Sequence, residues 1–282
     1  MDAMSEISVV MPVNNSEKYV SEAIESVLAQ SFDDFEFIIV DDGSTDNTYS
    51  IIQSFSDERI RLIQNKHDFI GSLNIGIYNA NGKYIARMDA DDIMHIDRLK
   101  IQQAVMQEYL DVTVCGTWAN TFGTGSQTNN LCGSVSGLVE KPILKLIQDN
   151  FLFHPTTMLR ADFLRKKSLK YENYSYAEDY KLWSEIAKSG GQFYVENQPL
   201  LYYRISDSQV SNKYRDEQKK TTELIIKEII EYLIGQNERE YPELSAMYNN
   251  LCNLQEKQLF TKYEISALFR NLFSKNEKKL NL

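Results

Sequence analysis

The 282-residue sequence has little cysteine, no long apolar run and no excess of positive charge. Its cysteines, Cys115, Cys132 and Cys252, are odd in number and widely separated, which fits neither a zinc cluster nor a disulfide framework. No segment approaches the about 20 consecutive apolar residues of a membrane-spanning helix. Residues 1–20 also lack the basic and apolar segments of a signal peptide. We therefore expect a cytoplasmic protein, either soluble or peripheral at the inner face of the plasma membrane.

The chain carries 40 acidic and 30 basic side chains, which gives a formal net charge of -10 at pH 7. A surface of this sign repels a phosphate backbone, and the sequence shows no local basic patch, so we expect no nucleic-acid partner. A nucleotide is still compatible with this charge if a metal ion bridges its phosphates. Hydrophobic residues make up 43% of the chain, which is ample for a packed core.

The N-terminal half alternates short apolar runs with segments of helical spacing. This order predicts an α/β fold with a mostly parallel sheet flanked by helices, such as one at Gly71–Asn79. Ligands bind such sheets beyond the carboxyl ends of the strands. Three polar segments fall there, namely Pro12–Asn15, Asp41–Asp46 and Asp89–Asp92. The predicted strands are Ser8–Val13, Phe35–Val40, Arg59–Ile63 and Tyr84–Met88.

The composition changes twice in the rest of the chain. The stretch Thr121–Gly137 is rich in Gly, Ser, Thr and Asn, which predicts a loop, and from about Lys213 the pattern is helical. We therefore assign residues 1–117 to a nucleotide-binding half, 118–212 to an acceptor-binding half and 213–282 to a C-terminal helical region. Helices are predicted near Asp97–Tyr109, Pro142–Asp149 and Glu178–Ser189, and strands near Val112–Thr117, Thr156–Arg160, Gln192–Glu196 and Leu200–Arg204.

The triplet Asp89-Ala90-Asp91 follows a predicted strand. Residues two apart on a strand project from the same side, so the two carboxylates can converge. Hard oxygen ligands of this kind suit Mg²⁺ or Mn²⁺. A solvated acidic loop, or negative charge at the start of a helix, fits the same residues, and the triplet alone leaves the choice open.

A second acidic stretch, Asp41–Asp46, ends another predicted strand. Here the carboxylate of Asp42 could accept hydrogen bonds from a base or a ribose. A capped turn before the next helix explains the same residues. The spacing of the carboxylates excludes an EF-hand.

These motifs together resemble the inverting family 2 glycosyltransferases of the GT-A fold, of the bacterial surface-polysaccharide type. The match runs in order over about residues 5–210, which makes it specific. It implies a GT-A, Rossmann-like sheet flanked by helices, with the C-terminal helices as an appendage. The matching residues are Ile7–Pro12, Asn15, Ala29–Phe32, Ile39–Asp46, Gly71, Asn74, Gly76, Gly82–Ile85, Met88–Asp92 and Glu178–Asp179.

The resemblance implies roles for individual residues. Asp42 would bind the uracil or ribose of a UDP-sugar, and Asp89 the ribose or sugar. Asp91 would ligate Mn²⁺ or Mg²⁺ at the diphosphate, with Asp89 as the second ligand. Glu178 and Asp179 match the family's acidic pair, in which the Asp is the catalytic base. On residues alone, a charged first helical turn is the preferred explanation of this pair.

Six further residues are candidates for substrate binding. For His154 and Arg204 a structural role, and for Trp183 a core position, fit the sequence equally well. Trp183 is a candidate because it follows Asp179 by four residues. The full set is Pro12, Asn14, Asn74, His154, Trp183 and Arg204.

The sequence departs from the family pattern at two positions. Many relatives carry a histidine two residues after the equivalent of Arg204, where it completes the metal shell, whereas this chain has Ser206. Asn14 stands where many relatives have an aromatic residue near the nucleotide. We therefore expect a cation with fewer protein ligands and a base without that stacking partner.

We expect an inverting hexosyltransferase that uses a UDP-sugar, with hexose or N-acetylhexosamine as the transferred group. The acceptor would be a glycan of a capsule, an O-antigen or a related surface polysaccharide, either free or lipid-linked. The C-terminal helices could touch a membrane through the apolar Leu268, Phe269, Leu272 and Phe273 and the lysines near the end. Two rivals are a nucleotidyltransferase, which would need a Gly-rich basic loop after the first strand, and a non-catalytic sugar-nucleotide-binding subunit.

Overall fold

The computed structural model describes residues 5–123, 130–206 and 213–281. The chain forms two compact units, each built from segments that are separate in the sequence. The first comprises Met1–Val139, Leu152–Asn173 and Gly191–Gln209. The second comprises Glu140–Phe151, Tyr174–Gly190 and Val210–Leu282. These units describe packing, and the functional division at residues 117 and 212 stays a prediction.

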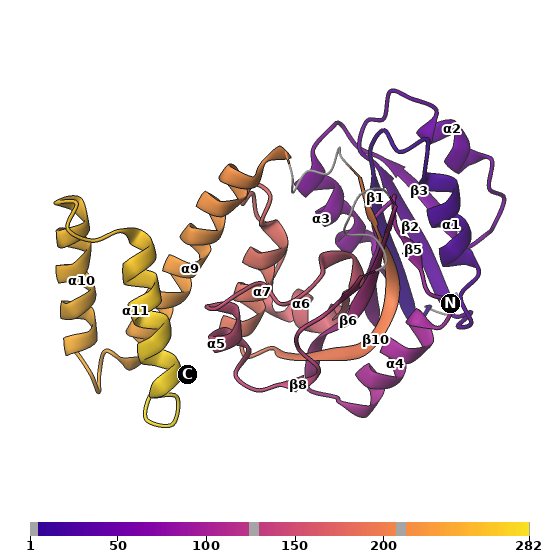
Figure 1. The fold of residues 1–282 in the computed structure, drawn as a ribbon. Helices are drawn as coiled ribbons and strands as arrows, with labels where there is room; N and C mark the ends of the chain where they lie inside the picture. The colour runs from indigo at the N-terminus through magenta and orange to yellow at the C-terminus, as the bar shows by residue number, and fades with distance from the viewer. Residues whose placement is uncertain (1–4, 124–129, 207–212, 282) are drawn as a thin grey trace. The chain divides into compact units, whose positions relative to one another are not determined.

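A sheet with the strand order β3-β2-β1-β4-β9-β6-β10-β5 forms the first unit (Figure 1). The first four strands in the chain pair in parallel. Val13 pairs with Asp41 and Asp41 with Gln64, so the carboxyl ends of three strands lie at one edge. These strands are β1 (Ile7–Val13), β2 (Phe35–Asp41), β3 (Ile60–Gln64) and β4 (Tyr84–Arg87).

The other half of the sheet is mixed. β9 (Met158–Arg160) runs antiparallel between β4 and β6, and β5 (Ile93–Met94) pairs antiparallel with β10. β6 (Val112–Gly123) and β10 (Gln192–Ile205) are long and parallel. The pairing of β5 with β10 brings the acidic segment after β4 beside Arg204.

Two predictions about this half were wrong. The two strands expected between residues 192 and 204 are one strand, because register shifts at Glu196 and Pro199 absorb the break. The predicted loop Thr121–Gly137 begins inside β6, and it contains β7 (Leu131–Cys132) and the first residue of β8 (Gly137–Val139). Residues 124–129 of that loop lie outside the described residues.

Helices cover the sheet, and alternate residues of β1 contact different helices. Val9 and Met11 belong to the main core cluster with residues of α1 and α4. Val10 instead faces α3, where a Cβ on Gly76 would approach the Val10 side chain to 2.2 Å, so the close contact requires glycine. The helices of this unit are α1 (Val20–Leu28), α2 (Thr48–Gln53), α3 (Phe69–Asn79), α4 (Arg98–Glu108) and α6 (Ala161–Lys167), with a 3-10 turn at His154–Thr156.

The second unit is helical. Its longest helix, α9, buries Ile225, Ile229 and Leu233 at helical spacing, as the apolar stripe predicts. Phe269 and Phe273 are also buried. In the described part of the chain, no helix is long and apolar enough to span a membrane. The helices are α5 (Pro142–Leu146), α7 (Glu178–Lys188), α9 (Arg215–Asn237), α10 (Glu243–Glu256) and α11 (Lys262–Lys275).

This architecture confirms the predicted fold class, a mostly parallel sheet flanked by helices with further helices at the C-terminus. The burial of Phe269 and Phe273 corrects one step in the membrane hypothesis. These two rings pack inside the helical unit, where Phe269 meets Tyr248 edge-on, so they cannot face lipid while the helices stay folded.

Candidate active site

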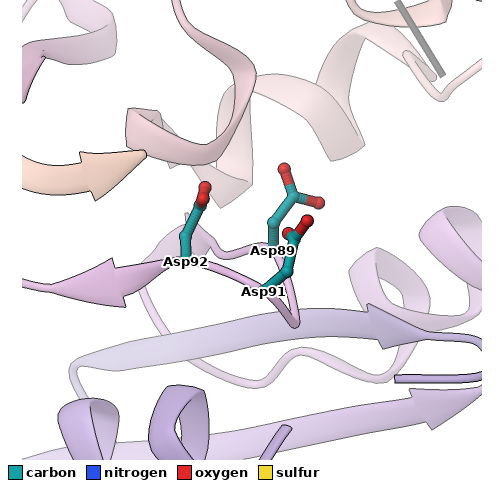
Figure 2. A group of neighbouring side chains, drawn as sticks. All are labelled: Asp89, Asp91 and Asp92. Atoms are coloured by element: carbon teal, nitrogen blue, oxygen red, sulfur yellow. The ribbon is translucent and has the colours of Figure 1, made fainter. Parts of the chain in front are cut away.

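Three carboxylates gather directly after β4. One ligand oxygen each from Asp89, Asp91 and Asp92 lies within 4.8 Å of the others. Figure 2 shows the three side chains pointing to the same side of the turn between β4 and β5. The structure therefore joins the two predicted residues, Asp89 and Asp91, with a third carboxylate.

A buried cation lies beside this cluster. The guanidinium of Arg87, a residue of β4 that is only 4% exposed, forms an ion pair with Asp89. Its Nε has no hydrogen-bond partner among the described residues. Burial lowers the pKa of Arg87, but the charge of Asp89 outweighs this and the pKa is raised overall, so the positive charge is permanent.

The negative charges of Asp91 and Asp92 are less well compensated than that of Asp89. Burial, and then repulsion from Asp89, raise the pKa of Asp91 to about 6. Burial, followed by Asp89 and Asp91, also raises the pKa of Asp92 well above its usual range. One oxygen of Asp92, Oδ2, is buried without a hydrogen-bond partner in the described part of the chain. A hard divalent cation would relieve this repulsion and supply the missing partner, so the donor set fits Mg²⁺ or Mn²⁺.

Arg204 fixes the acidic turn to β10. Its backbone N–H donates to Asp92 Oδ1 at 2.8 Å, and its Nε donates to the carbonyl oxygen of Asp91 at 2.6 Å. The guanidinium pairs with Glu22 and lies 4.4 and 4.2 Å from the ring centroids of Tyr19 and Phe122. The structure therefore gives Arg204 a supporting contact with the cluster and an ion pair, and its role at the diphosphate stays a prediction.

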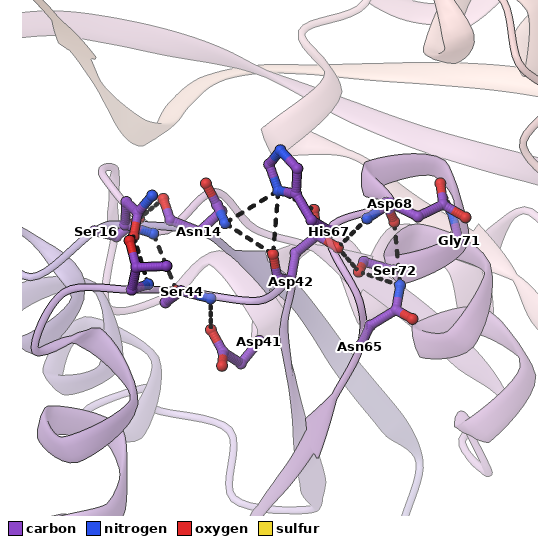
Figure 3. Close-up of polar contacts among 12 residues, drawn as sticks. Asn14, Ser16, Asp41, Asp42, Ser44, Asn65, His67, Asp68, Gly71 and Ser72 are labelled. Carbon is purple, nitrogen blue, oxygen red and sulfur yellow. Dashed lines mark hydrogen bonds and ion pairs between the residues drawn. The ribbon is translucent and has the colours of Figure 1, made fainter.

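The second acidic residue, Asp42, is buried at the end of β2 (Figure 3). Its Oδ1 accepts the backbone N–H of Asp68 at 2.6 Å and the hydroxyl of Ser72 at 2.8 Å. These bonds tie the carboxylate to the start of α3. The second oxygen, Oδ2, lies 3.8 Å from Nδ1 of His67.

Asn14 and His67 border the same carboxyl edge. Asn14 Nδ2 donates to the carbonyl oxygen of Asp42 at 2.8 Å and lies 3.5 Å from the His67 ring nitrogen. The His67 side chain is 81% exposed. Pro12, one residue before the end of β1, pairs with Val40. The structure thus gathers the predicted Pro12, Asn14 and Asp42 at one edge of the sheet.

Asn74 and His154 both contact Tyr171. Asn74 exchanges two hydrogen bonds of 2.9 Å with the backbone N–H and carbonyl of Tyr171. His154 Nε2 lies 2.6 Å from the Tyr171 hydroxyl oxygen. Burial, and then the charge of Arg87, hold the pKa of His154 well below its usual value, so the ring is neutral at pH 7. These contacts fix Asn74 and His154 to Tyr171, and their roles in substrate binding stay predictions.

The predicted base, Asp179, lies in the first turn of α7 in the second unit. Its Oδ2 accepts a hydrogen bond from Asn150 Nδ2 at 3.0 Å. Glu178 precedes it in the same turn and is partly exposed. Trp183 is 0% exposed, so in this conformation its ring belongs to the core of the unit.

Sequence reasoning missed several polar residues of these sites. Asp92 adjoins the triplet and lies in the predicted polar segment Asp89–Asp92, but it was not predicted to be a metal ligand. Arg87 lies within an apolar strand, and only the three-dimensional pairing with Asp89 shows its role. His67, Tyr171 and Asn150 carry no motif of their own.

Known proteins place the chain in a family. Residues 8–166 match the glycosyl transferase family 2. The chain belongs to this family. An uncharacterized glycosyltransferase of Haemophilus influenzae is 35% identical over 249 residues, which cover 81% of this chain and 74% of that protein.

Two further relatives carry more specific names. The putative glycosyltransferase EpsE of Bacillus subtilis is 32% identical over 72% of this chain and 74% of that protein. WfgD of Escherichia coli, a UDP-Glc:alpha-D-GlcNAc-diphosphoundecaprenol beta-1,3-glucosyltransferase, is 28% identical over 74% of this chain and 81% of that protein. The chain is accordingly a glycosyltransferase.

Solved structures support the GT-A fold. The structure of Staphylococcus aureus TarS residues 1–349 with UDP-GlcNAc matches 84% of this chain and 74% of that chain, with a TM-score of 0.61 and 20% identity. The mannosyltransferase PcManGT of Pyrobaculum calidifontis, in complex with GDP-Man and Mn²⁺, matches 99% of this chain and 89% of that chain, with a TM-score of 0.56 and 12% identity. At these identities the likeness concerns the fold.

Proposed function

We propose that this protein is an inverting, metal-dependent hexosyltransferase that moves a hexose or an N-acetylhexosamine from a UDP-sugar to a glycan acceptor. The observation that carries the metal dependence is the cluster of Asp89, Asp91 and Asp92. The raised pKa values of Asp91 and Asp92, and the buried Asp92 oxygen without a hydrogen-bond partner among the described residues, suit a divalent cation. The UDP-sugar donor is supported by the resemblance to WfgD, which is named for a UDP-Glc donor. The surface-polysaccharide setting is supported by the family resemblance of the sequence.

At the donor, Asp91 and Asp89 would hold Mn²⁺ or Mg²⁺. The cation, when bound, neutralises charge on the departing nucleoside diphosphate. Arg87 keeps Asp89 in place and compensates one of the three negative charges, and Arg204 holds the turn from the other side. Asp42, with Pro12 and Asn14 along the same edge, would contact the uracil and ribose.

At the acceptor, Asp179 would act as the general base. A hydroxyl group is a poor nucleophile, and a carboxylate within hydrogen-bonding distance accepts its proton as the new glycosidic bond forms. Attack opposite the leaving nucleotide inverts the anomeric carbon in a single displacement, so no covalent protein intermediate is needed. We place the acceptor-binding role in residues 118–212.

The acceptor proposal extends to lipid-linked glycans because WfgD is named for a diphosphoundecaprenol-linked sugar. An enzyme with such an acceptor would act at a membrane surface. The proposal therefore includes peripheral contact between the C-terminal helices and the membrane. The exposed side chain of Leu268 is available for such contact, whereas the buried rings of Phe269 and Phe273 are not.

The direct test is a panel of UDP-sugars and acceptors, including a GlcNAc-diphospholipid, with UDP release and glycosylated product both measured in Mn²⁺ or Mg²⁺. We expect one UDP-sugar to give product of inverted anomeric configuration. If no donor is hydrolysed or transferred while the protein still binds UDP, the chain is a binding subunit and the catalytic proposal is wrong.

A further inference from the structure

Two N–H groups from described residues of the second unit donate to the carboxylate of Asp179. Asn150 Nδ2 donates to Oδ2 at 3.0 Å, and the backbone N–H of Tyr180 donates to Oδ1 at 2.7 Å. Asn150 lies on the segment that follows α5, so this contact comes from a different element. Two donors on two different oxygens define the plane of the carboxylate, which a single donor would not.

The segment that carries Asn150 is itself fixed. The buried hydroxyl of Tyr180, the residue after Asp179, donates to the carbonyl oxygen of Leu146 at the end of α5. On the side of α11, Gln148 Nε2 donates to Ser274 Oγ at 3.2 Å. Consecutive residues of α7 thus contact both ends of residues 146–150. Asn150 is therefore presented to Asp179 by a braced segment.

We propose that Asn150 is the positioning residue of the catalytic base. This inference rests on the proposed role of Asp179. An amide N–H on one oxygen favours the ionised carboxylate, which is the form that accepts a proton, and prevents rotation about the last side-chain bond. Asn150 itself does not exchange a proton. Its contribution is the charge and orientation of Asp179.

A hydrogen bond to a charged group typically contributes a free energy that corresponds to a factor of about 10 to 100 in an equilibrium constant. Asn150→Ala should therefore lower kcat for sugar transfer by roughly that factor, whereas the affinity for the UDP-sugar, measured by calorimetry, stays at the wild-type value. Asn150→Ser keeps a shorter donor and should recover part of the loss. Lys145→Gln, at an exposed residue of α5 shortly before Asn150, serves as the matched control and should keep wild-type kcat.

A double-mutant cycle separates positioning from a general structural effect. If Asn150 acts through Asp179, adding Asn150→Ala to Asp179→Asn should not lower the residual transfer rate further. A loss in the Asp179→Asn background as large as that in the wild type would overturn the inference, and so would an equal loss in Lys145→Gln.

The same variants distinguish this inference from the proposed function. If Asp179→Asn is nearly inactive but Asn150→Ala transfers sugar at the wild-type rate, only the positioning role is wrong. If Asp179→Asn transfers at the wild-type rate, the base assignment is wrong and the role of Asn150 falls with it.

Discussion

Replacing Asp91 with Asn should stabilise the metal-free protein while removing its response to metal. In the metal-free fold, Asp91 is surrounded by Asp89 and Asp92, and its pKa is raised from 3.8 to about 6 by burial and by Asp89. A tenfold change in an acid dissociation constant corresponds to about 1.4 kcal/mol. The raised pKa of Asp91 therefore corresponds to about 3 kcal/mol of destabilisation at pH 7, and since Asp91 keeps some contact with solvent, we expect about 1 to 3 kcal/mol.

The sign follows from proton binding. Between pH 4 and pH 6 the folded state holds a proton on Asp91 that the unfolded state has released, so the free energy of unfolding falls as the pH rises through this window. Above pH 6 the loss in the free energy of unfolding stays constant. Asp91→Asn removes the ionisation, so its advantage over the wild type should be absent at pH 4, grow to pH 6 and then level off.

Urea unfolding in EDTA from pH 4 to pH 8 measures this difference, with Asp34→Asn as a control for an exposed carboxylate outside the cluster. Repeating the series with Mn²⁺ should stabilise the wild type and leave Asp91→Asn unchanged. The reasoning is refuted if the variant is less stable than the wild type at pH 7.5 in EDTA, or if both respond equally to Mn²⁺.

Three further changes test other parts of the structure. Asp179→Asn should lower kcat for transfer by about 10²- to 10⁴-fold at unchanged UDP affinity, and wild-type turnover would remove it as the base. His154→Asn should flatten the loss of stability below pH 6.5, because the folded state keeps this ring neutral while the unfolded state binds a proton; pH-dependent melting curves that match the wild type would contradict this. Ser206→His should tighten metal binding, which a Mn²⁺ titration measures, and an unchanged titration would exclude a missing ligand at this position.

The sequence predicted the parallel half of the sheet because its information is local. Each of the four strands is a short apolar run, and the acidic segments that follow them mark the carboxyl edge. The same locality explains the error in β10, which was predicted as two strands separated at residues 197–199. Pairing with β6 continues across that position through register shifts, and no feature of the local sequence reveals a partner about 80 residues away.

The candidate site was predictable in part for the same reason. Asp42, Asp89 and Asp91 sit in motifs that can be recognised along the chain. Arg87 cannot be recognised in this way, since an arginine inside a buried strand makes sense only once its partner Asp89 is seen. Trp183 shows the opposite limit, because spacing from Asp179 suggested a pocket residue, whereas helical packing places the ring inside the second unit.

The most direct measurement is calorimetric titration of the protein with UDP and with GDP, in Mn²⁺ and in EDTA, for the wild type and Asp91→Ala. We expect the wild type to bind UDP in preference to GDP and only with the metal, and Asp91→Ala to lose that metal-dependent binding. UDP binding that is equally strong in EDTA, or unchanged in Asp91→Ala, would contradict a metal-bridged UDP-sugar site at Asp89, Asp91 and Asp92.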